Sequence, residues 1–427
     1  MSSRVLRGVR PYGEAPVDIV FADGIITEIA PAGTGTGEVI NADGLIALPG
    51  FVDLHTHLRE PGREDAETVL TGSQAAALGG FTCVHAMANT TPVADTAGVV
   101  EQVWHLGLTA GLVDVRPVGA VTIGLGGERM AEIGAMAHSA AAVRVFSDDG
   151  KCVHDAVLMR RALEYVKAFD GVVAQHAQEP RLTEGAQMNE GELSGRLGLA
   201  GWPAVAEEAI IARDVLLAQH VGSRLHACHV STAGSVEVIR WAKGRGVDVT
   251  AEVTPHHLIL TEDLVSSYDP VYKVNPPLRT REDVEALRAA VADGTIDAIA
   301  TDHAPHPHED KDCEWAAAAM GMLGLETALG VAIQTLVQPG LLDWRGLADR
   351  MSVRPARIGR VATQGHDLVV GAVANIAVID PEAVRTVTPA ELASKSRNTP
   401  YAGYVLPGRV VHTVFAGTPT VLDGVLA

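Results

Sequence analysis

Short apolar runs alternate with longer amphipathic stretches over most of the chain. Between residues 51 and 364 the runs GFTCVHAM, AAVRVF, GVVAQHA, RLHACHV, DVTAEVT and DAIATDHA are short and rich in β-branched residues. Such runs are typical of strands that are buried on both faces. Strand and helix patterns alternate over roughly 300 residues, which predicts a parallel α/β fold. A (β/α)8 TIM-like barrel fits this length, since about 250 residues are typical, and a doubly wound sheet is the alternative.

The helical stretches carry start and stop signals of their own. In TREDVEALRAAVADG, Thr280 and Asp283 have the spacing of a capping box, and Gly294 follows the last periodic residue. These signals predict a helix that begins after Thr280 and ends at Gly294.

Both ends of the chain have a different pattern, with short β-type runs separated by turn dipeptides. VDIVFADGIITEIA places Asp23-Gly24 between two apolar runs, which predicts a hairpin, and Asp43-Gly44 repeats the signal. After residue 365 the runs HDLVVGAVANIAVID and GRVVHTVFAGTPTVLDG have the same texture. We therefore expect residues 1–50 and 365–427 to form one small β-sandwich domain, packed tightly against a barrel of residues 51–364.

Charge and cysteine content narrow the class of protein. The 427 residues include 33 basic and 52 acidic side chains, a formal net charge of −19, which argues against a nucleic-acid partner. The four cysteines are scattered without a C-x-x-C pair, and MSSRVLRGVRPYG has no apolar signal core. The uncharged stretches contain polar residues and Gly-Gly breaks, so no membrane span is predicted. We expect a reduced, cytoplasmic protein.

Two histidines at the end of the first of these runs suggest a metal site. In GFVDLHTHLREPG, His55 and His57 are two residues apart, so a strand would point both imidazoles to one side. The H-x-H pattern alone is weak evidence in a chain with 17 histidines.

Three later polar residues strengthen this interpretation because each follows another of the buried runs. They are His176, His229 and Asp302. Active sites of (β/α)8 enzymes lie at the carboxyl ends of the strands, where these side chains would meet. Zinc accepts imidazole and carboxylate ligands and in catalytic sites keeps a position for water. A bridge between two ions could come from Asp148, Asp149 or a carboxylated Lys151 in VRVFSDDGKCV.

Several motifs together resemble the amidohydrolase superfamily and, within it, dihydroorotases of the long bacterial type. They are PGFVDLHTHLREPG, MANTTP, FSDDGK, AQHAQE, CHVSTAGS, EVTPHHL, NPPLR and ATDHAPH, and the resemblance covers nearly the whole chain. It implies two zinc ions per subunit. The implied metal ligands are His55, His57, Asp149, His176, His229 and Asp302, with Asp149 as the bridge. The implied substrate-binding residues are Arg59, Asn89, Asn275 and His306.

The sequence departs from the family pattern at Ala88, where relatives usually carry proline, so the backbone at Asn89 is less restricted.

The resemblance also implies a reaction, the reversible cyclisation of N-carbamoyl-L-aspartate to L-dihydroorotate with loss of water in pyrimidine biosynthesis. Zinc would activate water for attack on the ring amide, and Asp302 would shuttle the proton. Arg59 suits a substrate carboxylate because a guanidinium binds it at two points, and an extended backbone would place it beside His57. A protonated His306 would add positive charge against the net negative field.

Two other functions compete with this one. A hydantoinase, dihydropyrimidinase or allantoinase would share the metal site, but such enzymes use a bridging lysine and have no substrate carboxylate for Arg59. A non-catalytic scaffold for aspartate transcarbamoylase would be expected to lack ligand histidines, which this chain retains. The resemblance leaves open a homodimer and an association with aspartate transcarbamoylase.

The remaining candidates have weaker patterns. Residues 303–315, HAPHPHEDKDCEW, fit a lid over the site and a solvated loop equally well. His256 and His257 are expected to support ligands or to have a structural part rather than to bind metal. Glu207 and Glu208, on a helix opened by Pro203, are expected on a solvated face. Cys152 and Cys228 are expected to be small buried side chains.

Overall fold

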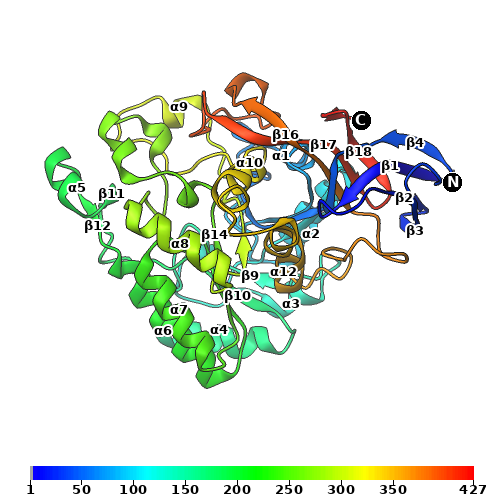
Figure 1. The fold of residues 1–427 in the computed structure, drawn as a ribbon. Coiled ribbons are helices and arrows are strands. Elements are labelled where there is room, and N and C mark those ends of the chain that lie inside the picture. The colour runs from blue at the N-terminus through cyan, green and yellow to red at the C-terminus, as the bar shows by residue number, and fades with distance from the viewer. Residues whose placement is uncertain (1–2) are drawn as a thin grey trace.

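The computed structural model describes residues 3–427 as an α/β protein whose parallel strands lie next to a separate sheet built from both chain ends (Figure 1). Eight strands, which we call the central strands, follow one another along the middle of the chain. They are β6 (Phe51–Thr56), β7 (Phe81–Ala86), β8 (Asp114–Pro117), β9 (Val145–Phe146), β10 (Val172–Gln175), β13 (Leu225–Ala227), β14 (Val249–Val253) and β15 (Ala298–Ile299).

The central strands pair in parallel throughout. One sheet has the order β6-β7-β8 and the other β15-β14-β13-β10-β9. Parallel bridges from Gly119 to Phe146 and from Thr56 to His303 link the two sheets at both of their edges. The neighbours therefore follow the cyclic order β6-β7-β8-β9-β10-β13-β14-β15 and back to β6. The α/β fold class expected from the sequence is confirmed.

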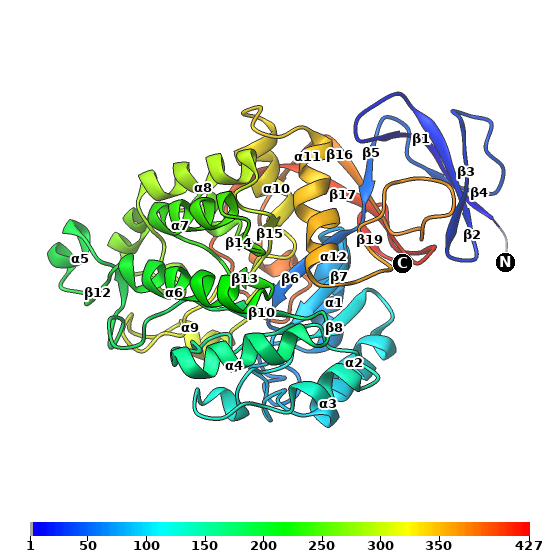
Figure 2. The same ribbon diagram turned by 90° about the horizontal axis from the view of Figure 1, so that it is seen from below.

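Helices connect successive central strands and pack on their outer side. They are α1 (Val69–Leu78), α2 (Ala97–Ala110), α3 (Ile133–His138), α4 (Ala156–Lys167), α6 (Val205–Val221), α7 (Ala233–Gly244) and α8 (Arg281–Asp293). Figure 2 shows α4, α6, α7 and α8 along one side of β10, β13 and β14. Helix α8 has the predicted capping box between Thr280 and Asp283 and ends at Gly294, whose φ of 86° is left-handed.

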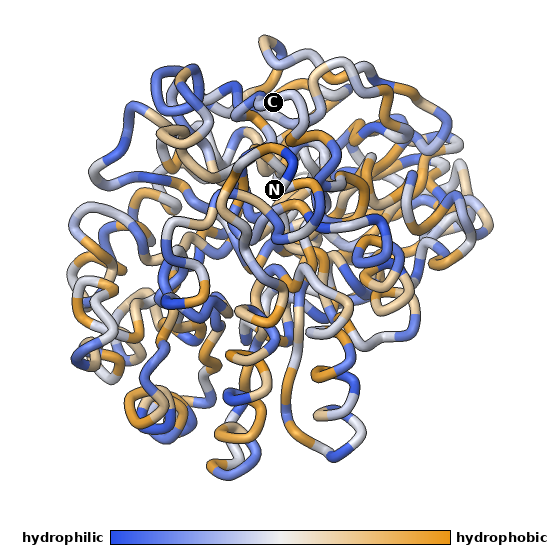
Figure 3. Tube along the Cα trace, turned by 90° about the vertical axis from the view of Figure 1, so that its left-hand side faces the viewer, coloured by the Kyte–Doolittle hydropathy of each residue, from blue (hydrophilic) through white to orange (hydrophobic). Residues whose placement is uncertain are grey.

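The helices are amphipathic, as packing on one side requires. Helix α4 buries Met159, Leu163 and Val166, whereas Arg160 and Arg161 face solvent. Figure 3 shows hydrophobic and hydrophilic residues alternating along the helices. Within residues 3–427, none of the helices is both long enough and apolar enough to cross a membrane.

Shorter elements complete the loops. After β10 come β11 (Met188–Asn189), α5 (Glu192–Leu197) and β12 (Gly201–Trp202), and after β15 come α9 (His308–Lys311), α10 (Ala328–Ala332), α11 (Trp344–Ala348) and α12 (Arg354–Ile358). Two π-helical turns, η5 (Ile333–Val337) and η6 (Asp349–Val353), extend α10 and α11. The 3-10 turns are η1 (Ile123–Leu125), η2 (His256–Leu258), η3 (Glu262–Ser267), η4 (Pro270–Tyr272) and η7 (Pro389–Glu391).

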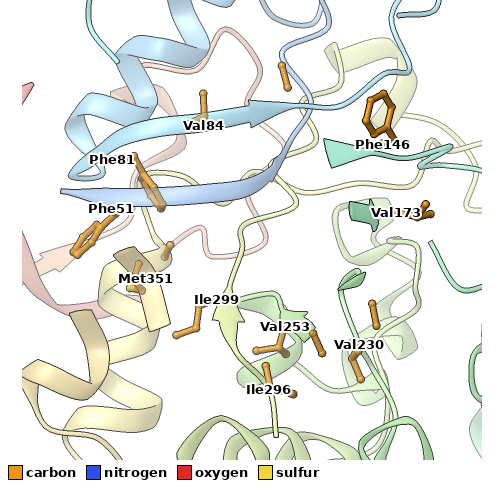
Figure 4. Close-up of a cluster of buried hydrophobic side chains, with 14 of the residues drawn as sticks. Phe51, Phe81, Val84, Phe146, Val173, Val230, Val253, Ile296, Ile299 and Met351 are labelled. Carbon is orange, nitrogen blue, oxygen red and sulfur yellow. The ribbon is translucent and has the colours of Figure 1, made fainter. Parts of the chain in front are cut away.

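A continuous hydrophobic core joins the central strands to their helices. The rings of Phe51 on β6 and Phe81 on β7 meet edge to face at 5.6 Å, and Phe146, Val253 and Ile299 extend the cluster (Figure 4). These side chains are almost fully removed from water. Burying each of them contributes roughly 1.5–3 kcal/mol, which keeps the strand ends in fixed positions.

Residues from both chain ends share one nine-stranded sheet. Its strands are β1 (Arg4–Pro11), β2 (Val17–Ala22), β3 (Ile25–Pro31), β4 (Glu38–Asn41), β5 (Ile46–Pro49), β16 (Ile376–Thr386), β17 (Val405–Phe415), β18 (Thr418–Leu422) and β19 (Val425–Leu426). Antiparallel pairing of β5 with β16 joins the two segments. The hairpin at Asp23-Gly24 is confirmed by the β2–β3 pairing.

Two expectations for this region are wrong. Asp43-Gly44 does not form a hairpin, because β4 and β5 both pair in parallel with β1 rather than with each other. The run HDLVVGAV does not begin a strand, since β16 starts only at Ile376. Val369 and Val370 in that run are more than half exposed, so these apolar residues do not belong to a buried strand.

A cavity of about 470 Å³ lies where α1 and α10 face the β16–β17 pair. Its buried acid is Glu326, which accepts a hydrogen bond from the Ala393 backbone at 2.8 Å and lies 3.9 Å from Arg385. Burial raises the pKa of Glu326 to about 7, and these two contacts offset only part of that effect.

The substitution Glu326→Gln tests whether the buried Glu326 carboxyl group makes the stability of the protein depend on pH. Because the folded-state pKa is raised above 4.5, the folded protein binds more protons than the unfolded chain, and stability declines as pH rises from 4.5 through 7. We expect the variant to be more stable than the parent by on the order of 3 kcal/mol at pH 8 and similar to it near pH 4.5. Urea unfolding at both pH values measures the difference. Glu391→Gln, an exposed acid lining the same cavity, is the control; a pH-independent effect of Glu326→Gln would contradict the prediction.

Candidate metal and substrate site

Four histidines surround the carboxylate of Asp149 at the carboxyl ends of the central strands. Asp149 Oδ1 lies 3.2 Å from His55 Nε2, His176 Nδ1 and His229 Nε2, and Asp149 Oδ2 lies 3.4 Å from His57 Nε2. All five side chains are buried. Residues separated by up to 174 positions thus meet because β6, β9, β10 and β13 all end on the same side of the central strands.

Asp302 completes the cluster from the loop after β15. Its Oδ1 lies 3.1 Å from His57 Nε2 and 3.6 Å from His55 Nε2. The backbone at Asp302 has a φ of 47°, and the neighbouring His303 carbonyl accepts a hydrogen bond from the His57 backbone at 2.8 Å. All six residues that the resemblance implies as metal ligands therefore lie within one cluster.

The geometry separates the three candidates for a bridge. Asp148 turns away, with Oδ1 accepting hydrogen bonds from the backbones of Val121 at 2.8 Å and Thr122 at 2.9 Å. Lys151 is exposed. Asp149 alone of the three faces the histidines.

The outer nitrogen of three of these histidine rings contacts an oxygen acceptor. His55 Nδ1 lies 2.8 Å from Glu252 Oε1, His57 Nδ1 lies 2.9 Å from Asn89 Oδ1, and His176 Nε2 lies 2.8 Å from Gln178 Oε1. When an inner nitrogen gives up its proton to bind a metal ion, the outer nitrogen keeps its own proton on the oxygen acceptor, as metal ligation requires.

This arrangement fits divalent metal ions. The inner His55 Nε2 is buried and makes no hydrogen bond. Within each of two groups, the possible ligand atoms all lie within 4.8 Å of one another. The groups are His55-His57-Asp149 and Asp149-His176-His229, and Asp149 belongs to both. Imidazole nitrogens with carboxylate oxygens form a donor set that zinc accepts.

Glu252 contacts the cluster and was not singled out from the sequence. Besides His55, it contacts His226, with Oε2 3.0 Å from Nε2, and His226 Nδ1 lies 2.9 Å from Thr250 Oγ1. Burial alone would raise the Glu252 pKa, but His226 and His55 hold it well below its ordinary value. A glutamate inside the buried run DVTAEVT was the available signal, because such a charge needs a partner.

Electrostatics keep the two aspartates of the cluster ionised. Burial opposes ionisation, yet His55, His176 and His229 hold the Asp149 pKa well below its ordinary value. The Asp302 pKa is likewise lowered, because the hydrogen bond from His57 and the positive charge of His55 outweigh burial. Both carboxylates are therefore available as anionic ligands or bases.

Arg59 and His306 lie together beside the cluster, though not as the sequence reasoning expected. Arg59 does not continue the strand: its φ is 63°, and its Nε donates to the Pro305 carbonyl at 3.0 Å. Its NH2 lies 3.3 Å from His306 Nε2. Burial lowers the Arg59 pKa to about 10, so the guanidinium stays charged. Burial and the Arg59 charge hold the His306 pKa far below its usual range, so His306 is neutral rather than protonated.

The two asparagines also reach the site. Asn89 contacts His57, as described, despite Ala88 in place of proline. Asn275 donates from Nδ2 to Gln178 Oε1 at 3.2 Å, and its own Oδ1 is buried without a hydrogen bond. Gln178 was not singled out from the sequence, although it lies two residues after His176 in AQHAQE.

The weaker expectations have mixed outcomes. Glu207 is not on a solvated face: it is buried and accepts a hydrogen bond from the Ser231 backbone at 3.0 Å, whereas Glu208 is half-buried. His257 contacts Thr254 Oγ1 at 2.7 Å and the Pro277 carbonyl at 3.3 Å, which fits a structural part, and a part in supporting ligands stays a prediction. Cys152 and Cys228 are buried, as expected.

The segment 303–315 is fastened to its surroundings at Lys311. This lysine is buried, and its Nζ donates to the backbone carbonyls of Pro270, Lys273 and Ala319 at 2.8–3.1 Å. His308 and Asp312 on either side of it are exposed. The expectation that this segment is only a solvated loop is therefore wrong. The alternative expectation, a mobile lid over the site, stays a prediction.

Comparisons with known proteins agree with this geometry. Residues 44–235 match the family model described as dihydro-orotase-like. The chain is 67% identical to the dihydroorotase of Streptomyces coelicolor, over 100% of both chains, and 58% identical to the dihydroorotase of Mycobacterium tuberculosis, over 99% of both.

Solved structures with the same fold are more distant in sequence. The L-hydantoinase of Arthrobacter aurescens superposes with a TM-score of 0.88 at 25% identity, over 100% of this chain and 98% of that one. The dihydropyrimidinase of Brevibacillus agri gives 0.85 at 21% identity, over 100% and 96%, which is evidence for the fold alone. Identity of 58–67% over 99–100% of both chains shows that the chain belongs to the dihydroorotase family.

Proposed function

We propose that this metal-dependent cyclic amidohydrolase interconverts N-carbamoyl-L-aspartate and L-dihydroorotate at the cluster around Asp149. The observation that carries the proposal is the contact of one buried carboxylate with four imidazoles, beside a half-buried arginine. The cyclic strand order supports a (β/α)8 barrel of residues 51–364. The sheet shared by both chain ends supports a small β domain of residues 1–50 and 365–427, and its form as a β-sandwich stays a prediction.

The donor atoms suit two zinc ions per subunit. His55, His57 and Asp302 would hold one, His176 and His229 the other, and Asp149 would bridge them. Bound there, the ions would lower the pKa of a coordinated water and polarise the amide carbonyl. Glu252, Asn89 and Gln178 support this role because they fix the outer ring nitrogens.

Asp302 is the residue that moves the proton. Its carboxylate is ionised, buried and 3.1 Å from His57. In ring opening it would accept a proton from the attacking water and deliver it to the leaving ring nitrogen. In ring closure it would take the proton from the attacking carbamoyl nitrogen.

Arg59 supplies the charge that recognises the substrate. The formal charge of −19 repels a carboxylate substrate, so attraction has to be local. With His306 neutral, Arg59 is the cation of this pair, and His306 offers hydrogen bonding only. Two parallel N–H groups on the guanidinium match a carboxylate, which the ring of dihydroorotate carries.

This recognition disfavours the alternative functions. Hydantoin, dihydrouracil and allantoin lack a carboxylate for Arg59, and the exposed Lys151 does not face the cluster as a bridging lysine would. A non-catalytic scaffold does not need the complete ligand set. A homodimer, association with aspartate transcarbamoylase and a cytoplasmic location stay predictions.

The direct experiment measures ring opening by purified, zinc-supplied protein on L-dihydroorotate, hydantoin, dihydrouracil and allantoin. We expect turnover confined to dihydroorotate. Turnover of another ring in its place would overturn the substrate assignment, and no turnover of any ring would overturn the proposal of an enzyme.

Asp149→Asn should lower zinc content from two ions to one or none per chain, because the bridging charge is lost. Metal analysis after dialysis against trace zinc measures this. Asp148→Asn is the matched control: it disturbs a buried carboxylate one residue away that faces Val121 and Thr122, so it should reduce stability and leave zinc content at two. Equal zinc content in both variants would refute the bridge.

Arg59→Ala should raise the KM for dihydroorotate about 10- to 100-fold, since a charge-assisted contact is removed, and should leave zinc content unchanged. Steady-state kinetics with metal analysis measures both quantities. Arg63→Ala, which removes an exposed arginine paired with Asp65 and Asp310, should leave KM unchanged. An unaltered KM in Arg59→Ala would remove Arg59 from the site.

Asp302→Asn should lower kcat by at least about 100-fold, the usual contribution of a general base. The rate is measured on protein whose zinc content has been determined, so that loss of metal and loss of the base are separated. A fully loaded variant with a near-normal kcat would show that another group moves the proton.

A further inference from the structure

Gln178 lies between a metal-site histidine and a substrate-site asparagine. It follows β10 by three residues, and its Oε1 lies 2.8 Å from His176 Nε2 and 3.2 Å from Asn275 Nδ2. One amide oxygen therefore contacts both halves of the proposed active site.

The direction of these hydrogen bonds is set from outside the site. Thr183 Oγ1 donates to the Glu179 carbonyl at 3.0 Å, which leaves the hydroxyl oxygen free to accept. Gln178 Nε2 donates to that oxygen at 2.8 Å. While the Thr183 hydroxyl donates to Glu179, the Gln178 amide meets this contact with its nitrogen, and its oxygen then faces His176 and Asn275.

The orientation of Gln178 fixes the proton on His176. Because Gln178 Oε1 can only accept, His176 Nε2 has to carry the proton. Nδ1 is then the nitrogen available to bind a metal ion, and it faces Asp149 and His229 at 3.2 Å and 2.9 Å. The tautomer suited to a metal ligand is thus imposed by a neighbour that is not itself among the proposed ligands.

The same orientation fixes Asn275. Its Nδ2 has to be the atom facing Gln178, so Oδ1 points elsewhere, and Oδ1 is buried without a hydrogen bond. A buried acceptor without a partner costs stability unless a ligand supplies a donor. The ring and ureido N–H groups of a cyclic amide and its opened form are donors of this kind.

We infer that Gln178 is a positioning residue: it turns the Asn275 carbonyl oxygen toward a substrate N–H and holds His176 in its metal-binding tautomer. The substrate part of this inference rests on the proposed function. The part of the inference that concerns His176 rests on the hydrogen bonds of Gln178 with His176, Asn275 and Thr183.

The test compares Gln178→Met, which removes the acceptor at similar length, with Gln178→Glu, which keeps an acceptor for both partners. In Gln178→Glu the Thr183 hydroxyl can turn to donate to the carboxylate. Gln178→Met should raise the KM for dihydroorotate at least about 10-fold with a smaller change in kcat, and Gln178→Glu should stay within about threefold of the parent.

A double-mutant cycle identifies the route to the substrate. If Gln178 acts through Asn275, adding Gln178→Met to Asn275→Ala should change KM by less than about twofold. Independent, multiplying effects on KM would overturn the substrate part, because a merely structural role would weaken both backgrounds alike.

Zinc affinity of the metal-free protein, measured by competition with a chromophoric chelator, tests the metal part without using activity. Gln178→Met should bind about 10- to 100-fold more weakly and Gln178→Glu at least as tightly as the parent. Equal affinities for all three would overturn the tautomer role. Should the parent fail to open dihydroorotate, the proposed function fails, and the affinity comparison still decides the role of Gln178.

Discussion

The negative charge of Asp149 is the constraint on which the site depends. Removing a carboxylate from water costs several kcal/mol unless opposite charge and hydrogen bonds compensate. Here the compensation comes from four imidazoles at the ends of three strands, β6, β10 and β13. Moving any one of these strands would leave the carboxylate poorly compensated, so the charge couples the site to the whole strand arrangement.

A layer of outer contacts keeps the imidazoles in position. Glu252 holds His55, Asn89 holds His57 and Gln178 holds His176, each through the ring nitrogen that faces away from Asp149. The backbone contact of His57 with the His303 carbonyl ties β6 to the loop that carries Asp302. The hydrophobic core of Phe51, Phe81 and Phe146 beneath these loops makes the arrangement stiff.

The sequence predicted those parts of the molecule that local patterns determine. Period-2 spacing placed His55 and His57 on one side, the capping box placed the start of α8, and strand-end positions brought His176, His229 and Asp302 together. Contacts between residues far apart in the chain could not be predicted from local patterns. Glu207 reads as a surface residue until Ser231 is known to lie against it, and Glu252 and Gln178 have roles only through partners distant in sequence. Arg59 reaches the site through a left-handed backbone conformation, which the motif HLREPG does not predict.

The central claim, that Asp149 bridges two metal ions held by four histidines and Asp302, is tested most directly by anomalous X-ray diffraction at the zinc absorption edge on crystals of the zinc-loaded protein. The account predicts two peaks, one beside His55, His57 and Asp302 and the other beside His176 and His229, with the Asp149 carboxylate between them. One peak coordinated without Asp149, or bridging by Lys151, would contradict it.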